Sequence, residues 1–125
     1  MKHTITDIFF DLDHTLWDFE KNSELTFRKI FHENHIAIQI DNFLSVYREV
    51  NLYYWKRYRE EKITKEKLRY ERLKKTFDEL SYAVDDTMIH TLAEAYIKYL
   101  STYTHLFKDT IAILDYLKPQ YKLHI

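Results

Sequence analysis

The sequence predicts an α/β protein in which a long helical segment is inserted directly after the first strand of a parallel sheet. A short apolar run from Thr4 to Asp11 is typical of a buried strand. Between about residues 20 and 102 apolar residues recur at helical spacing, and Tyr121 to Ile125 again has the pattern of a strand. We therefore expect two parts of an α/β core, residues 1–18 and 103–125, around a helical domain of residues 19–102.

The first strand is predicted from its compact apolar residues Ile5, Ile8, Phe9 and Phe10, a run too short for a helix. Buried parallel strands read as continuous apolar runs of this kind. The strand ends at the carboxylate of Asp11.

Four helices are expected next, joined by short connections. The first covers about residues 20–33 and ends at Asn34 or His35, and the second covers about 41–61. Thr64 is the expected N-cap of the third, and Asp85 or Asp86 begins the fourth. Long helices with broad apolar faces and short connections predict an antiparallel bundle.

The end of the sequence predicts a return to the sheet. A short helix should begin near Asp109, with Ile111, Leu114 and Leu117 facing inward, and Pro119 should end it. The second strand follows.

Composition limits the class of protein. The 125 residues are 46% hydrophobic, and 19 basic residues nearly balance 20 acidic ones. We therefore expect a folded cytoplasmic protein that binds neither nucleic acid nor membrane, since no strong net field and no apolar run of about 18 residues is present. Cysteine is absent, which excludes disulfides and thiolate metal sites. Glycine is absent too, although α/β proteins usually place it in strand-to-helix turns.

The residues that indicate chemistry are Asp11-Leu12-Asp13-His14-Thr15, directly after the first strand. Residues two apart in extended backbone point the same way, so both carboxylates leave the strand end on one side. Mg²⁺ prefers such oxygen ligands together with substrate phosphate. One carboxylate could then attack phosphorus while the other transfers protons, and the Thr15 hydroxyl could hold the loop. The alternative is that Asp11, Asp13 and Thr15 are ordinary turn residues.

The segment Asp-Leu-Asp-His-Thr-Leu-Trp-Asp-Phe resembles the first motif of the haloacid dehalogenase-like hydrolases, and more narrowly of their pyrimidine 5'-nucleotidase-like branch. In that branch an all-helical cap follows at once, and Asn51 to Trp55, Lys62 to Glu66, and Leu68, Arg69 and Arg72 are similar to its cap pattern. The resemblance implies a Rossmann-like core, of which this sequence would hold only the first strands, with a helical cap inserted.

By this resemblance Asp11 would be the nucleophile and a magnesium ligand, and Asp13 the acid/base that also contributes to the metal site. Leu12 and Thr15 would bind the substrate phosphate. The implied activity is Mg²⁺-dependent hydrolysis of a phosphomonoester, a nucleoside 5'-monophosphate by preference. Two departures are noted: His14 and Glu61 stand where relatives often have Gly.

The family also needs a phosphate-binding Ser or Thr, a Lys and a later acidic pair, which this sequence does not contain. We therefore expect a truncated chain that alone is inactive and that associates through open strand edges. Two rivals remain: a non-catalytic helical interaction domain that retains the motif, and a phosphomutase or dehalogenase on the same scaffold.

Other residue groups favour structural roles. The seven histidines include His32 and His35, for which surface and helix-end positions are expected rather than zinc binding. The aromatic stripe of the second helix could stack a nucleobase, but at helical spacing it is expected in the core; it comprises Tyr53, Tyr54, Trp55 and Tyr58. The basic residues from Lys56 to Lys75, Arg72 among them, alternate with acidic ones, which predicts a solvated face with ion pairs.

Overall fold

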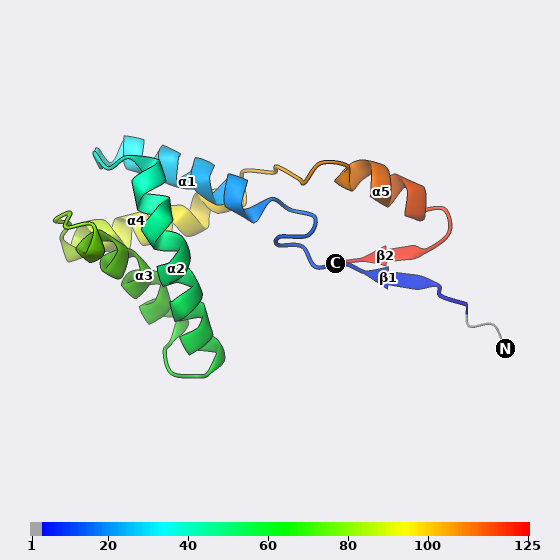
Figure 1. Ribbon diagram of the computed structural model, residues 1–125, viewed down its shortest axis with the longest axis horizontal. Helices are drawn as coiled ribbons and strands as arrows, with labels where there is room; N and C mark the ends of the chain where they lie inside the picture. The colour runs from blue at the N-terminus through cyan, green and yellow to red at the C-terminus, as the bar shows by residue number, and fades with distance from the viewer. Residues whose placement is uncertain (1–3) are drawn as a thin grey trace.

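The computed structural model describes residues 4–125 as two groups of elements joined by two linkers (Figure 1). One group is a bundle of four helices, and the other is a pair of short strands with one helix beside it. In chain order the elements are β1 (Asp7–Phe9), α1 (Phe19–Glu33), α2 (Ile40–Arg59), α3 (Lys65–Glu79), α4 (Asp86–Leu100), α5 (Thr110–Leu117) and β2 (Lys122–His124).

β1 and β2 pair in parallel, with Ile8 opposite Leu123, and α5 forms the last part of the crossover between them. The pairing extends by one bond beyond the strands, from the Phe10 N–H to the His124 carbonyl at 2.9 Å. Both predicted strands and their parallel order are confirmed.

The apolar side chains of this region are less buried than in a complete parallel sheet, which is expected where the sheet has only two strands, whereas the exposure of Ile111 departs from the prediction. The Phe9 side chain is 76% exposed and stacks only on the His124 ring, with 4.6 Å between the ring centroids. Ile111 in α5, which was expected to face inward, is 58% exposed. A parallel strand is buried only when other elements pack on both faces of its sheet. This sheet has two strands, and α5 is the one helix beside it in the described residues, so its apolar side chains stay exposed.

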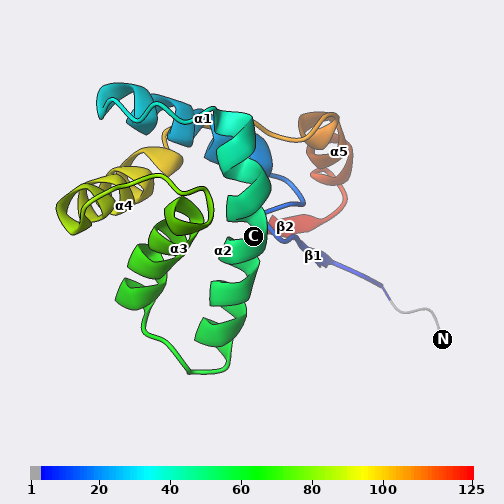
Figure 2. The same cartoon turned by 60° about the vertical axis from the view of Figure 1, so that its left-hand side comes forward.

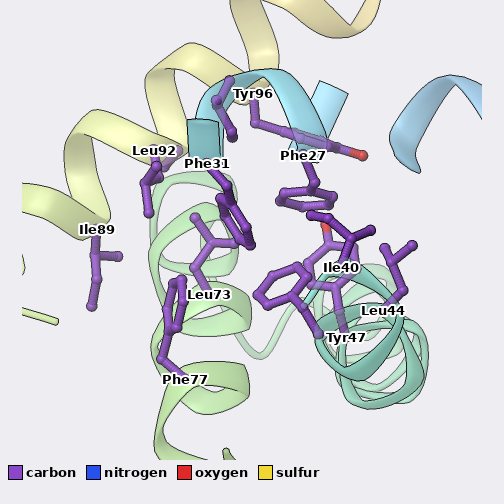
Figure 3. Packing of buried hydrophobic residues seen from close by; sticks show 13 residues of the cluster. Phe27, Phe31, Ile40, Leu44, Tyr47, Leu73, Phe77, Ile89, Leu92 and Tyr96 are labelled. Carbon is purple, nitrogen blue, oxygen red and sulfur yellow. The ribbon is translucent and has the colours of Figure 1, made fainter. Parts of the chain in front are cut away.

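The apolar core lies inside the four-helix bundle and is centred on aromatic rings (Figure 3). Phe27 of α1 is fully buried and contacts the rings of Phe31, Phe43, Tyr47 and Tyr96, with centroid distances of 4.6–5.6 Å. These rings come from α1, α2 and α4. Since aromatic pairs stabilise beyond their buried area, these contacts give the bundle an apolar core made of its own residues.

The C-terminal half of α2 departs from the prediction. None of the expected core aromatics Tyr53, Tyr54, Trp55 and Tyr58 is buried, and Tyr53 is exposed. This half of α2 extends past α1 and α4 and packs beside α3 (Figure 2). Helical spacing therefore predicted that these aromatic residues share a side of α2, but too few helices pack against this half of α2 to bury them.

The helices begin as predicted. The side chains of Asp18, Thr64 and Asp85 accept hydrogen bonds from the N–H groups three residues later, at 3.1, 3.2 and 2.8 Å. Such caps satisfy N–H groups that lack an intrahelical partner, which fixes where α1, α3 and α4 start.

Three helices end in the same way. His35, Glu61 and Ser81 follow α1, α2 and α3 with φ of 57°, 59° and 54°. After each, the next N–H bonds a carbonyl five residues back, as in Ile36 to Phe31 at 2.9 Å. This is the Schellman arrangement, which usually uses Gly at the left-handed position. The chain thus lacks glycine but still adopts the conformations that favour it.

Candidate active site

The site begins where the β1–β2 pairing ends. After the Phe10 bond to β2, the chain carries the exposed side chains of Asp11 and Asp13 away from the carboxyl end of the parallel pair. A tight turn follows at once. The Leu12 carbonyl accepts the N–H groups of Thr15, Leu16 and Trp17, at 3.4, 3.0 and 2.8 Å.

His14 is the residue that allows this turn. Its φ of 63° is left-handed, which costs a residue other than Gly about 1–2 kcal/mol, although His is among the side chains found there more often. Its N–H bonds the Trp17 carbonyl at 3.2 Å, and its ring lies 5.0 Å from that of Phe19. The departure from Gly at this position is therefore accommodated by local contacts.

The backbone on either side of the first carboxylate is available to a ligand. Within residues 4–125, the N–H groups of Asp11, Leu12 and Asp13 have no hydrogen-bond acceptor. Successive free N–H groups beside a strand end are a usual binding arrangement for phosphate oxygens. The Thr15 hydroxyl also has no hydrogen-bond partner in this range. The loop is therefore held by backbone hydrogen bonds, and the expectation that the Thr15 hydroxyl holds it is wrong.

The donor set fits a hard cation bound together with substrate. In the described part of the chain no three His, Cys, Asp or Glu residues gather into a metal site. Asp11 and Asp13 remain as two carboxylates at one strand end, and Mg²⁺ typically uses one or two carboxylates plus water and substrate phosphate. His32 and His35 lie in and just after the last turn of α1, as expected for helix-end residues.

An open cavity of about 430 Å³ lies beside the second carboxylate. Its wall combines the turn after β1 with the end of α4, and is formed by Leu12, Asp13, Trp17, Ile97, Leu100 and Ser101. The bundle therefore borders the space next to Asp13.

The two linkers between the strands and the bundle are bonded to each other (Figures 1 and 2). The Asp18 N–H donates to the His105 carbonyl at 2.9 Å, and the Phe107 N–H donates to the Leu16 carbonyl at 3.1 Å. The indole N–H of Trp17 reaches the Tyr103 carbonyl at 3.2 Å. The bundle is thus attached through one paired segment.

Asn22 is a site-supporting residue that the sequence reasoning missed. Its side chain is fully buried and bonds both backbone groups of His105, donating to the carbonyl and accepting from the N–H, each at 3.0 Å. A signal was present, because Asn22 shares the helix face of Thr26 and Ile30, where a lone amide must find partners.

Two comparisons bear on this geometry, while no family model matches the sequence. The chain is 25% identical over 118 residues to YfnB of Bacillus subtilis (strain 168), described as a HAD-hydrolase. A crystal structure of YfnB bound to magnesium, which reveals interdomain movement, superimposes with a TM-score of 0.83 at 23% identity.

The match covers nearly all of this chain and about half of the relative. It spans 94% of this chain and 48% of YfnB in sequence, and 97% and 51% in structure. The expected fold, a haloacid dehalogenase-like core region with an inserted helical cap, is confirmed. The resemblance to that superfamily is confirmed with it, and the nucleotidase-like branch stays a prediction.

Proposed function

We propose that this chain carries the nucleophile and the cap of a magnesium-dependent phosphomonoester hydrolase, in line with its similarity to a HAD-hydrolase. One observation carries the proposal. Asp11 and Asp13 leave the end of a parallel strand together, beside three backbone N–H groups without acceptors in residues 4–125. Carboxylates and phosphate-binding N–H groups at one strand end are what acyl-phosphate chemistry requires.

The residues divide the reaction into two steps. A carboxylate oxygen of Asp11 attacks phosphorus in line, and the bond from phosphorus to the leaving oxygen breaks as Asp13 protonates that oxygen. Asp13 then removes a proton from water, which attacks the acyl-phosphate and releases phosphate with Asp11 restored. Mg²⁺, if held by the Asp11 carboxylate and the main-chain carbonyl of Asp13, would offset the negative charge of the phosphate oxygens. The Leu12 N–H, which has no acceptor in residues 4–125, would donate to one of those oxygens.

The bundle is proposed as the lid of the site. Ile97 and Leu100 of α4 share a cavity with Asp13, so the bundle borders the space next to the proposed acid while the phosphate would lie at the strand end. Exclusion of bulk water from this space would favour transfer of the phosphoryl group to Asp11 over direct attack by water in the first step. A nucleoside 5'-monophosphate is the proposed substrate, in keeping with the resemblance of the first motif and the cap.

The test is steady-state hydrolysis by the natural protein at its full length, with nucleoside 5'-monophosphates and either Mg²⁺ or EDTA. Asp11→Asn should lower kcat by about 10³-fold or more, because an amide cannot form the acyl-phosphate. Asp41→Asn, an exposed carboxylate of α2, is the matched control and should keep full activity. Full turnover by Asp11→Asn would refute the mechanism, and turnover unaffected by EDTA would refute the metal.

No helix in residues 4–125 is long and apolar enough to cross a membrane.

A further inference from the structure

Arg72 of α3 is a buried cation without a carboxylate partner. Its exposure is 4%, whereas the sequence predicted a solvated, ion-paired position. The pairs expected around it do form, as in Lys74 with Asp78 at 2.7 Å and Lys75 with Glu79 at 3.6 Å. Arg72 itself pairs with no acidic residue among those described, and its Nε has no hydrogen-bond partner. Buried charges are normally paired, so this arginine requires an explanation.

The groups around the guanidinium are neutral. Its Nη1 donates to Oδ1 of Asn51 at 3.1 Å, and its Cζ lies 5.1 Å from the ring centroid of Tyr96 and 6.0 Å from that of Tyr47. Burial raises the pKa of the Tyr47 phenol well above its ordinary value and also raises that of Tyr96. Both phenols therefore stay protonated, and none of the groups that contact the guanidinium carries a negative charge. The charge of the Asp13 carboxylate contributes to the raised pKa of Tyr96, so the cluster lies within electrostatic reach of the proposed site.

Besides the Nε of Arg72, two donors of this cluster have no acceptor of good geometry in residues 4–125. The Tyr47 hydroxyl is buried and makes no hydrogen bond of acceptable geometry, although the Tyr96 hydroxyl lies close enough to influence its pKa. The Oδ1 of Asn51 is occupied by Arg72, which leaves its Nδ2 as a free donor. The Tyr96 hydroxyl, by contrast, shares a hydrogen bond of 3.0 Å with Ser23. What the cluster lacks is an acceptor.

A small cavity of about 80 Å³ is lined both by residues of the cluster and by the loop of the proposed site. Tyr47, Asn51 and Ser23 line it together with His14, the residue that follows Asp13. Among its lining residues the one carboxylate is Glu20, which is already paired with Arg48 at 2.6 Å. Arg72 lies behind Asn51 and does not line the cavity itself, so its charge acts through that amide.

We propose that Tyr47 and Asn51, backed by the charge of Arg72, form a subsite in the bundle that binds an acceptor oxygen of the substrate's leaving group. The volume suits a single carboxylate or the carbonyl edge of a base. That this group belongs to the substrate rests on the proposed function, while the existence of the subsite does not. The subsite would hold the far end of the leaving group as the phosphate reaches Asp11.

The subsite is tested by binding to the chain itself. Arg72→Met is compared with Arg59→Met, an exposed arginine of α2, by thermal unfolding with sodium acetate, uridine or adenosine, against sodium chloride at equal ionic strength. For wild type we expect a Tm increase of about 5 °C at roughly ten times the Kd of acetate or uridine. Arg59→Met should keep that increase and Arg72→Met should lose it. Adenosine, which has no carbonyl group, should give none.

A second measurement needs no variant. The buried Nε–H of Arg72 should give a resolved ¹H–¹⁵N signal that shifts with acetate or uridine, and this decides the matter if Arg72→Met does not fold. A response to acetate alone would identify the bound group as a carboxylate, and a response to uridine would identify it as the carbonyl group of a base. No effect of either ligand, or equal effects on wild type and Arg72→Met, would overturn the subsite. Asp11→Asn should retain the response, so loss of turnover with binding intact separates the two proposals.

Discussion

Replacing Asn22 with alanine should loosen the attachment of the bundle to the strands. The change removes two hydrogen bonds, both to backbone groups of His105. The two losses differ in their consequences. The His105 carbonyl keeps a second bond, from the Asp18 N–H at 2.9 Å, whereas the His105 N–H keeps no partner in residues 4–125.

The cost can be worked out from these contacts. Each hydrogen bond contributes about 1 kcal/mol net, and an N–H left unsatisfied costs about 1–3 kcal/mol when buried. Because His105 lies near the surface, water can reach its N–H, which places that second cost at its lower end. Alanine restores about half a kcal/mol through its helix propensity. We expect the free energy of unfolding to fall by about 2 kcal/mol.

Urea unfolding of the chain, monitored by circular dichroism, measures this change. The shift in the urea midpoint gives the change in the free energy of unfolding, provided that the slope m of free energy against urea concentration is unchanged. Amide hydrogen exchange adds a local readout, since protection of the His105 N–H should be lost while that of the bundle core is kept. Asn42→Ala, at an exposed position of α2, is the control and should change stability by less than about 0.5 kcal/mol. If Asn22→Ala matches that control and His105 stays protected, the linker bonds are not what fixes the bundle.

Three further changes test other parts of the structure. Glu61→Gly should raise the free energy of unfolding by about 1 kcal/mol, because it relieves a left-handed φ of 59°. Glu71→Gly, in the middle of α3, should lower it by a similar amount, and changes of the same sign would contradict this reasoning. The Thr6 hydroxyl and the His124 ring hold the pKa of Asp7 below its usual value. Its stabilising effect is therefore present above the unfolded pKa and is lost as pH falls through the folded one, and Asp7→Asn should flatten stability between about pH 5 and pH 2. Asp13→Asn should slow hydrolysis yet still permit magnesium-dependent labelling of the protein by phosphate from a good leaving group, and absence of labelling would count against its role as acid.

Local signals predicted most of the fold. Helix starts at Thr64 and Asp85 and the left-handed end at His35 depend on a few neighbouring residues, and each is found where the sequence places it. The motif at Asp11 and Asp13 is local as well, since its geometry follows from a strand end and one turn.

Burial could not be predicted equally well, because it depends on which elements come to lie nearby. Tyr53 is aromatic but exposed, since α1 and α4 do not reach that half of α2. Arg72 is charged but buried, since α1, α2 and α4 all contribute side chains around it. Period and composition place each residue on a face of its own element and say nothing of what covers that face.

The parallel pairing of Asp7 with Lys122 also has a consequence for the order of folding. Each helix of the bundle can form from contacts close in sequence, whereas β1 and β2 meet only when both ends of the chain come together. The entropy lost on closing a loop increases with its length, and non-local pairing is slow for that reason. A folded bundle shortens the effective loop, because α1 and α4 contact each other and bring Asp18 beside His105. The bundle should therefore form first, and the strand that precedes Asp11 and Asp13 should be completed last.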